Sequence, residues 1–215
     1  MLGIIRVLTT KDNQVLQEHG SRLTELYGIE SKSSCIASQP NGIYDDESEK
    51  AAIPKIVALA QEMAEDEEIE AITISCAADP GLKEARQAVD IPVFGAGICG
   101  AHAASMVGSK VAVVGITEQP PPAMKKQLGE TFYNYAFSPR LRKTTDLFQQ
   151  YAKPELLRVI NKAIEAGADV ILFACTGFST IRLKAYLQKH LEVPVVDLVE
   201  AQGIAYQLLR KEQPE

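Results

Sequence analysis

Two stretches of this sequence decide its fold, because each carries an apolar strand that ends on a cysteine. The first is Ala71-Ile-Thr-Ile-Ser-Cys76, which runs on into Ala-Ala-Asp-Pro-Gly81. The second is Asp169-Val-Ile-Leu-Phe-Ala-Cys175, which runs on into Thr-Gly-Phe-Ser-Thr180. Each is followed by a helical segment and then by a short strand entered through a proline. The cysteines lie 99 residues apart in a chain of 215, so the sequence predicts two related halves with one thiol in each.

Outward from these stretches, apolar strands and amphipathic helices alternate along the chain. This pattern is typical of parallel sheets covered by helices on both faces. The predicted strands are 4–10, 33–38, 71–75, 91–94, 110–116, 132–137, 170–174 and 193–196. The predicted helices are 14–26, 47–67, 81–89, 122–129, 154–166, 179–190 and 198–211. We expect Asp79 to cap the third of these helices, with Pro80 at its first position.

The fold class predicted from this order is α/β, with two pseudosymmetric lobes that are each a mainly parallel sheet flanked by helices. The first lobe is expected over residues 1–95 and the second over 96–197, with a C-terminal helix within 198–215 packing back on the first. Arg6–Asp12 resembles Val113–Gln119, and each stretch ends the first strand of its half. Because ligands of open α/β sheets bind outside the carboxyl ends of the strands, we expect the active site in the cleft between the lobes.

The composition is that of an ordinary globular protein and narrows the possible partners. A net charge of −6, with 46% hydrophobic and 23% charged residues, gives no electrostatic case for binding nucleic acid or an anionic membrane. No run approaches the ~18 apolar residues of a membrane span, and the N-terminus lacks the pattern of a signal peptide. Four cysteines without a CxxC pair, and only three histidines, argue against a disulfide framework and a zinc site. We expect a cytoplasmic protein with reduced thiols that acts on a small molecule.

Cys76 and Cys175 are the candidate catalytic residues, because a thiol with a pKa of about 8.5 is a better base near neutrality than any hydroxyl. Both precede a predicted helix start, where backbone N–H groups favour the thiolate and bind anions. Two thiols on opposite faces of one carbon can invert a stereocentre, one as base and the other as acid. No cofactor is required if oriented N–H and O–H donors stabilise the carbanion. The alternative is that such cysteines are core residues, which is our interpretation of Cys35.

The candidate substrate-binding groups are hydroxyls and backbone N–H groups at the same strand ends. They belong to Thr9, Thr10, Ala77, Thr117, Thr176 and Gly177. Such donors suit a carboxylate or a cyclic ureide carbonyl, although the threonines could equally cap strands or helices. Arg140, Arg142 and Lys143 form the one basic cluster, which is either a solvated loop or a site for an anionic substrate.

At these residues the chain resembles the aspartate/glutamate/hydantoin racemase superfamily, most closely its hydantoin racemase branch. The segments that carry the resemblance are Ser75–Leu82 with Ala85-Arg86, Ile91–Gly95, His102–Gly108 with Lys110–Val114, Ala166–Gly177 and Val193–Asp197. The resemblance implies two pseudosymmetric lobes, a cofactor-independent mechanism with Cys76 and Cys175 as acid and base, and a homo-oligomer.

Two departures from the branch concern the substrate. Thr9–Asp12 stands where an Asn-Pro-Asn type loop is usual, and Ala174–Phe178 replaces Gly-Cys-Ala-Gly-Met. The expected function is racemisation or epimerisation next to a carbonyl, on hydantoin-type or amino-acid substrates. An aspartate/glutamate racemase and a decarboxylase or isomerase of the superfamily are alternatives, as is a non-catalytic small-molecule binding protein.

Several other motifs have a functional and a structural interpretation. Gly95–Gly100 is a literal GxGxxG with Glu118 23 residues after its first glycine, which also fits a nucleotide-dependent oxidoreductase. We favour packing for Cys99, and a cap or a lobe interface for His102. Tyr44–Glu47 is interpreted as the entry to a helix rather than as a metal site.

Overall fold

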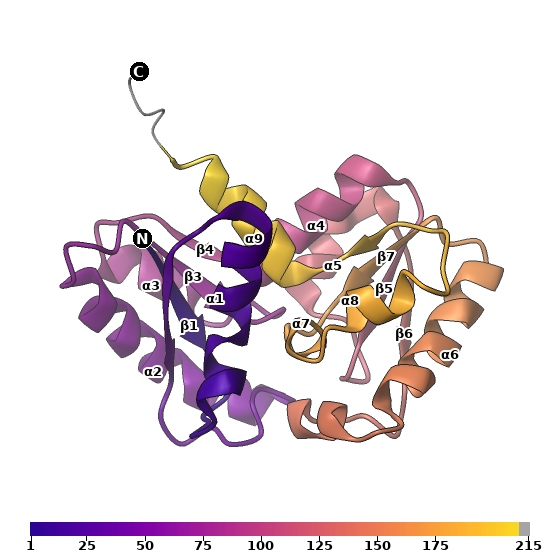
Figure 1. The fold of residues 1–215 in the computed structure, drawn as a ribbon, viewed down its shortest axis with the longest axis horizontal. Helices are drawn as coiled ribbons and strands as arrows, with labels where there is room; N and C mark the ends of the chain where they lie inside the picture. The colour runs from indigo at the N-terminus through magenta and orange to yellow at the C-terminus, as the bar shows by residue number, and fades with distance from the viewer. Residues whose placement is uncertain (211–215) are drawn as a thin grey trace.

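The computed structural model describes residues 1–210 and contains two four-stranded parallel sheets (Figure 1). The first sheet has the order β2-β1-β3-β4, with strands Leu2–Arg6 (β1), Ser31–Cys35 (β2), Ala71–Ser75 (β3) and Val93–Gly95 (β4). The second has the order β6-β5-β7-β8, with strands Val111–Gly115 (β5), Phe132–Phe137 (β6), Val170–Phe173 (β7) and Val195–Val196 (β8). Both sheets follow one scheme, so the predicted α/β class with paired parallel sheets is confirmed.

Helices cover the sheets and connect them. They are α1 (Asn13–Tyr27), α2 (Asp46–Ala64), α3 (Leu82–Ala88), α4 (Ala96–Val107), α5 (Pro122–Leu128), α6 (Ala152–Glu165), α7 (Gly177–Thr180), α8 (Leu183–Leu187) and α9 (Leu198–Gln207), with short 3-10 turns η1 (Gly129–Thr131) and η2 (Thr144–Phe148). The chain passes from the first sheet to the second through α4, and α9 returns to contact α4, α1 and β3 (Figure 1). The division of the chain at residue 95 stays a prediction. The predicted last helix 198–211 ends at Gln207 in the structure, and its residue 211 lies outside the described residues.

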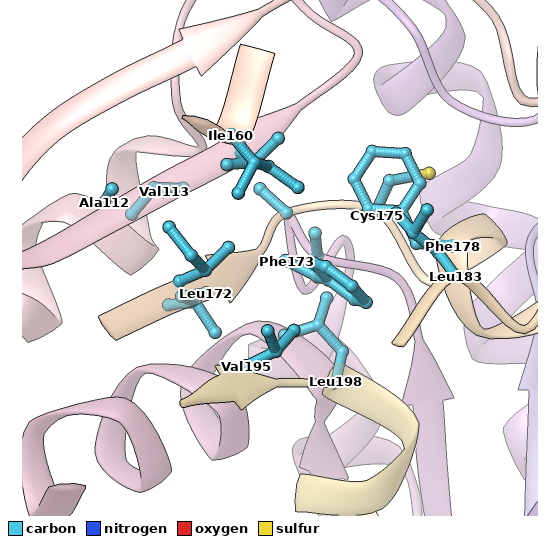
Figure 2. Packing of buried hydrophobic residues seen from close by; sticks show 14 of the residues in the cluster. Ala112, Val113, Ile160, Leu172, Phe173, Cys175, Phe178, Leu183, Val195 and Leu198 are labelled. Atoms are coloured by element: carbon cyan, nitrogen blue, oxygen red, sulfur yellow. The ribbon is translucent and has the colours of Figure 1, made fainter. Parts of the chain in front are cut away.

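The central strands are apolar because they are covered on both faces. Every residue of β1, β3, β5 and β7 is buried. In the second half, Phe173 and Phe178 pack edge to face with ring centroids 5.1 Å apart, and Leu198 joins them from α9 (Figure 2). Figure 2 also shows Cys175 at the border of this cluster, so its backbone is held by a rigid core.

Several predicted elements have other bounds in the structure, and two of these differences concern the site. Residues 7–10 were expected to continue the first strand, but β1 ends at Arg6 and Thr9 belongs to a loop. The predicted helix 179–190 is divided into α7 and α8, because Arg182 adopts a left-handed backbone with φ 53°. Within residues 1–210, no helix is long and apolar enough to cross a membrane.

The prediction that Asp79 and Pro80 begin the third helix is wrong. Gly81 is the N-cap residue of α3 and has φ 66°, while Asp79 itself has φ 52°. The Asp79 carboxylate instead accepts hydrogen bonds from the N–H groups of Gly97 and Ile98, each at 2.7 Å. It thereby caps α4, whose own N-cap residue, a glycine, has no side chain to do so.

Candidate active site

Cys76 and Cys175 leave equivalent strands of the two sheets. Both β3 and β7 are central strands, each hydrogen-bonded to a neighbour on either side. Cys76 follows the last residue of β3, and Cys175 follows β7 after Ala174, whose N–H donates to the Val114 carbonyl at 2.7 Å. The two residues are 9% and 8% exposed. The sheets therefore fix the backbone of both thiols at their carboxyl ends.

A single cavity of about 660 Å³ is lined by both cysteines. Its walls come from the strand ends of both sheets, from the start of α2 and from the proline run before α5. The predicted residues Ala77, Thr117 and Thr176 line it together with the thiols, whereas Thr9, Thr10 and Gly177 are not part of its lining. The volume suits a small organic molecule.

The threonine hydroxyls predicted as substrate donors are hydrogen-bonded within the protein. Thr9, Thr117 and Thr176 each donate to a backbone carbonyl, at 2.5, 2.8 and 3.0 Å respectively. Thr10 accepts from the N–H of Asp12, the residue that caps α1. In this structure these side chains stabilise loops, as the alternative interpretation proposed, and their role in substrate binding stays a prediction.

The surroundings of Cys76 disfavour its thiolate. Burial raises the pKa of this thiol well above its ordinary value, and one backbone N–H, from Ala78, opposes that effect. The nearby charges of Asp79, Cys175 and Glu49 raise the pKa further, because each adds a negative charge next to the sulfur. Of the two thiols, Cys76 therefore holds its proton more strongly.

The surroundings of Cys175 are more favourable to a thiolate. Burial raises the pKa of Cys175 to about 11, but the N–H groups of Gly177 and Phe178 and the side chain of Thr144 all form hydrogen bonds that lower it. The positive charge of Arg6 lowers it as well. Cys175 lies immediately before the N-terminus of α7, so its environment stabilises negative charge where that of Cys76 does not.

Sequence reasoning did not identify several polar residues at this site. Glu49 lines the cavity, and Thr144 lines it beside Cys175. His19 and Arg6 are buried behind the two strand ends, with exposed fractions of 1% and 4%. The signal for His19 was present, because it lies between Leu16 and Leu23 at the helical spacing of a buried face. Nothing local indicates that Glu49 or Thr144 reaches the cavity.

The glycine-rich stretch Gly95–Gly100 is explained by packing within the protein. Its N–H groups at Gly97 and Ile98 already bind the Asp79 carboxylate, where a dinucleotide would place its pyrophosphate. A Cβ atom at Gly95 would lie 2.1 Å from Asp79 Oδ1, and one at Gly97 would lie 2.2 Å from the Ala77 carbonyl oxygen. The glycines let α4 approach the loop after Cys76, which removes the support for the oxidoreductase alternative.

The remaining motifs also have structural roles or lie on the surface. Asp45 is the N-cap residue of α2 and forms a capping box with Ser48, so the prediction of a helix entry is confirmed. Cys99 is partly buried within α4, and His102 is exposed on the same helix. Cys35 ends β2 and is partly buried. Among residues 1–210, no three His, Cys, Asp or Glu side chains are arranged to hold a metal ion.

The basic cluster reaches the cavity through Arg142 alone, and that side chain is paired. Arg142 Nη2 lies 2.8 Å from Glu118 Oε1, while Lys143 and Arg140 lie over the rings of Tyr44 and Tyr151. The charged residues that line the cavity are Asp45, Asp46, Glu47, Glu49, Glu118 and Arg142. Carboxylates therefore predominate there, which opposes the binding of a dicarboxylate.

The sequence profile of the family described as Asp/Glu/Hydantoin racemase matches residues 8–202. A hydantoin racemase from Pseudomonas sp. (strain NS671) is 33% identical over 147 residues, which are 64% of this chain and 57% of that relative. The aligned part thus spans little more than half the length of that curated protein.

Solved structures share the fold at lower sequence identity. An allantoin racemase from Klebsiella pneumoniae superimposes with a TM-score of 0.80 at 21% identity, over 97% of this chain and 86% of that one. A glutamate racemase from Bacillus anthracis superimposes with a TM-score of 0.71 at 18% identity, over 97% of this chain and 80% of that one. The two-sheet architecture is thus shared with racemases of more than one substrate class.

Proposed function

The chain belongs to the Asp/Glu/hydantoin racemase family, and from that premise we propose that it inverts a stereocentre with Cys76 and Cys175 as the opposed acid and base. The observation that carries this proposal is the shared cavity, which both thiols line from equivalent strands of the two sheets. A substrate held between them would present one face of its carbon to each sulfur, as direct inversion requires.

The reaction needs only proton transfers. The thiolate of one cysteine takes the proton from a carbon next to a carbonyl, so that the C–H bond breaks and an S–H bond forms. The thiol of the other cysteine then gives its proton to the opposite face of the carbanion. Backbone N–H groups at Ala77 and Thr176, which line the cavity, are suited to bind the carbonyl oxygen as it gains charge. The two thiols exchange roles for the opposite enantiomer.

A neutral cyclic ureide is the substrate class that the cavity favours. Its lining carries five carboxylates and one arginine, and that arginine is paired with Glu118. A hydantoin ring is uncharged near neutral pH and offers carbonyls to N–H donors, whereas aspartate and glutamate would add negative charge to an acidic site. We therefore place hydantoin-type substrates, allantoin included, ahead of the acidic amino acids, and we retain a cytoplasmic homo-oligomer as a prediction.

The test compares single variants at both thiols with a matched third cysteine. Wild-type protein should racemise 5-benzylhydantoin or allantoin, followed by polarimetry, and NMR in deuterated water should show deuterium at the inverted carbon. Cys76→Ser and Cys175→Ser should each reduce turnover by about 10³-fold, which is within the usual range for loss of a general acid or base. Cys99→Ser should change it by less than about twofold, because Cys99 does not line the cavity.

Each alternative function gives a different result when the same assay is extended to aspartate, glutamate and a malonate. Full activity in either cavity variant would exclude the two-thiol mechanism. Turnover of aspartate or glutamate but of no hydantoin would indicate an amino-acid racemase, and loss of carbon dioxide from a malonate would indicate a decarboxylase. A non-catalytic binding protein would introduce no deuterium, and its two strand-end thiols would react slowly and interchangeably with an alkylating agent.

A further inference from the structure

A single buried histidine connects the two strand ends that carry the thiols. His19 of α1 has its Nδ1 2.8 Å from Ser75 Oγ, and its Nε2 3.0 Å from Thr180 Oγ1 and 3.1 Å from the Thr176 carbonyl oxygen. Ser75 directly precedes Cys76 and Thr176 directly follows Cys175. The imidazole therefore touches the backbone or side chain of a residue next to each cysteine, without lining the cavity itself.

On the side of the first sheet, Gln202 of α9 fixes Ser75, the hydrogen-bond partner of His19. Ser75 Oγ donates to Gln202 Oε1 at 3.1 Å, and Gln202 Nε2 donates to Thr73 Oγ1 at 2.5 Å. Thr73 in turn donates to the Phe94 carbonyl at 3.2 Å. All of these side chains are buried, so the end of β3 is tied to α1, α9 and β4 by bonds from which water is excluded.

On the side of the second sheet, the partner of the histidine is fixed by Arg6. The Arg6 Nη1 atom donates to the carbonyls of Val15 and Leu16 at 2.7 and 2.8 Å, and its Nη2 donates to Thr180 Oγ1 at 3.2 Å. A guanidinium group can only donate, so Thr180 accepts this bond and keeps its own hydrogen for another acceptor. Arg6 thus places Thr180 of α7 against the ring of His19.

The neutral form of the imidazole is the one that this environment favours. Burial lowers the pKa of His19 well below its ordinary value, and the nearby charge of Arg6 lowers it further. A neutral imidazole has one N–H donor and one acceptor nitrogen, so it can hold one hydroxyl on each side. It is also rigid, unlike a lysine or a glutamine in the same position.

We propose that His19 is a positioning residue that holds the strand ends of Cys76 and Cys175 at one separation, an inference that rests on the proposed function. Inversion between two thiols requires both sulfur atoms to reach one carbon, and a misplacement of about 1 Å can cost about 10²-fold in rate. Because Ser75 donates its hydrogen to Gln202, the Nδ1–H of the neutral imidazole donates to Ser75. Its Nε2 then accepts from Thr180 of α7, so His19 acts through Ser75 and Thr180 rather than on the substrate. A histidine that only filled the core would have no such effect on both thiols together.

The first test is the division of the effect between kcat and KM. His19→Leu should lower kcat on 5-benzylhydantoin by about 10²-fold while changing KM by less than about twofold, because the substrate contacts remain. His19→Gln, which keeps one donor and one acceptor, should recover kcat to within about tenfold of wild type. The matched control is Leu23→Ala, a buried position of the same helix outside this network. It should leave kcat within about threefold of wild type.

The second test does not depend on turnover. Mass spectrometry of the two cysteine-containing peptides measures the rate at which iodoacetamide alkylates each thiol. In His19→Leu this rate should change by about threefold or more at both Cys76 and Cys175, and in Leu23→Ala it should change at neither. A change at only one thiol, or a kcat within threefold of wild type in His19→Leu, would overturn the proposal. If wild type turned over neither 5-benzylhydantoin nor allantoin, the proposed substrate class would fail, and the alkylation rates would still decide the role of His19.

Discussion

The loops after Cys76 and Cys175 begin at the same place in two like sheets, yet they surround their sulfur atoms with different groups. The first loop turns away through Asp79 and Gly81, both with positive φ, before α3 begins. The second enters α7 within two residues, so that its first N–H groups point at Cys175. The same topology thus places the thiol of Cys76 near a carboxylate and the thiol of Cys175 next to a helix N-terminus.

This difference shows that a repeated fold does not make the two halves of a site equivalent. The order of strands fixes where each thiol lies, because the carboxyl ends of central parallel strands meet the same cleft. The charge at each sulfur depends instead on the few residues that follow it. With Arg6 and Thr144 beside Cys175, and with Asp79 and Glu49 near Cys76, the resting base is expected to be Cys175.

The largest effect that we expect from this difference between the two thiols is the separation of proton exchange from inversion. Cys76→Ala and Cys175→Ala should both lose racemisation by about 10³-fold, because each lacks one of the two proton-transfer groups. Cys76→Ala should still exchange the proton of one enantiomer with deuterated water, since the better base remains. NMR of single enantiomers of 5-benzylhydantoin measures this exchange. Faster exchange in Cys175→Ala than in Cys76→Ala would reverse the assignment.

The pH dependence of turnover tests the same assignment in the unmodified protein. Burial raises the pKa of Cys175 to about 11, so its thiolate fraction, and with it kcat/KM, should rise about tenfold per pH unit between about pH 6 and 8, where a hydantoin ring is neutral. The pKa of Cys76 is higher still, so no falling limb should appear in that range. Initial rates across the range measure the profile, and a bell with its maximum near pH 7 would contradict it.

The same pKa shifts act in the opposite direction on folding. Both thiols have a raised pKa in the folded state, so the folded protein binds more protons than the unfolded chain above the ordinary thiol pKa of about 8.5. Their contribution to stability is therefore complete below that pH and declines as the pH rises toward the folded-state values. Rates at high pH should be taken within the time for which circular dichroism shows the fold intact.

Much of the fold could be predicted from the sequence because it follows from apolar strands and their spacing. The boundaries of β3 and β6 agree with the predicted ranges 71–75 and 132–137, and both thiols lie at the expected strand ends. The cap of α4 could not be predicted, because Asp79 adopts a left-handed backbone and its partners Gly97 and Ile98 are 18 and 19 residues away. A local rule assigned that carboxylate to the nearest helix.

The candidate site was predictable only as far as strand ends determine it. Thr117 and Thr176 lie where the sheets place them, but their hydroxyl hydrogens go to carbonyls of the protein. The contribution of Thr144 comes from a 3-10 turn that no strand or helix pattern indicates. The contact between His19 and Thr180 joins residues 161 apart in the chain, and such a pairing emerges only when both lobes are folded together.

The smallest expected effect concerns the charge of Asp79. Its carboxylate raises the pKa of Cys76, so Asp79→Asn should increase the rate at which iodoacetamide alkylates Cys76 by about threefold, consistent with a pKa change of about half a unit. Asparagine tolerates the left-handed backbone at this position and keeps one acceptor for the N-terminus of α4. Cys175 in the same protein is the internal control, because Asp79 is not among the groups that shift its pKa.

Glu49→Gln should also increase the rate at which Cys76 is alkylated, but more weakly, since Glu49 contributes less to the shift in the pKa of Cys76. Equal acceleration at both thiols would mean that the substitution had loosened the fold, and no acceleration at Cys76 would mean that the two sulfur atoms differ for reasons other than neighbouring charge.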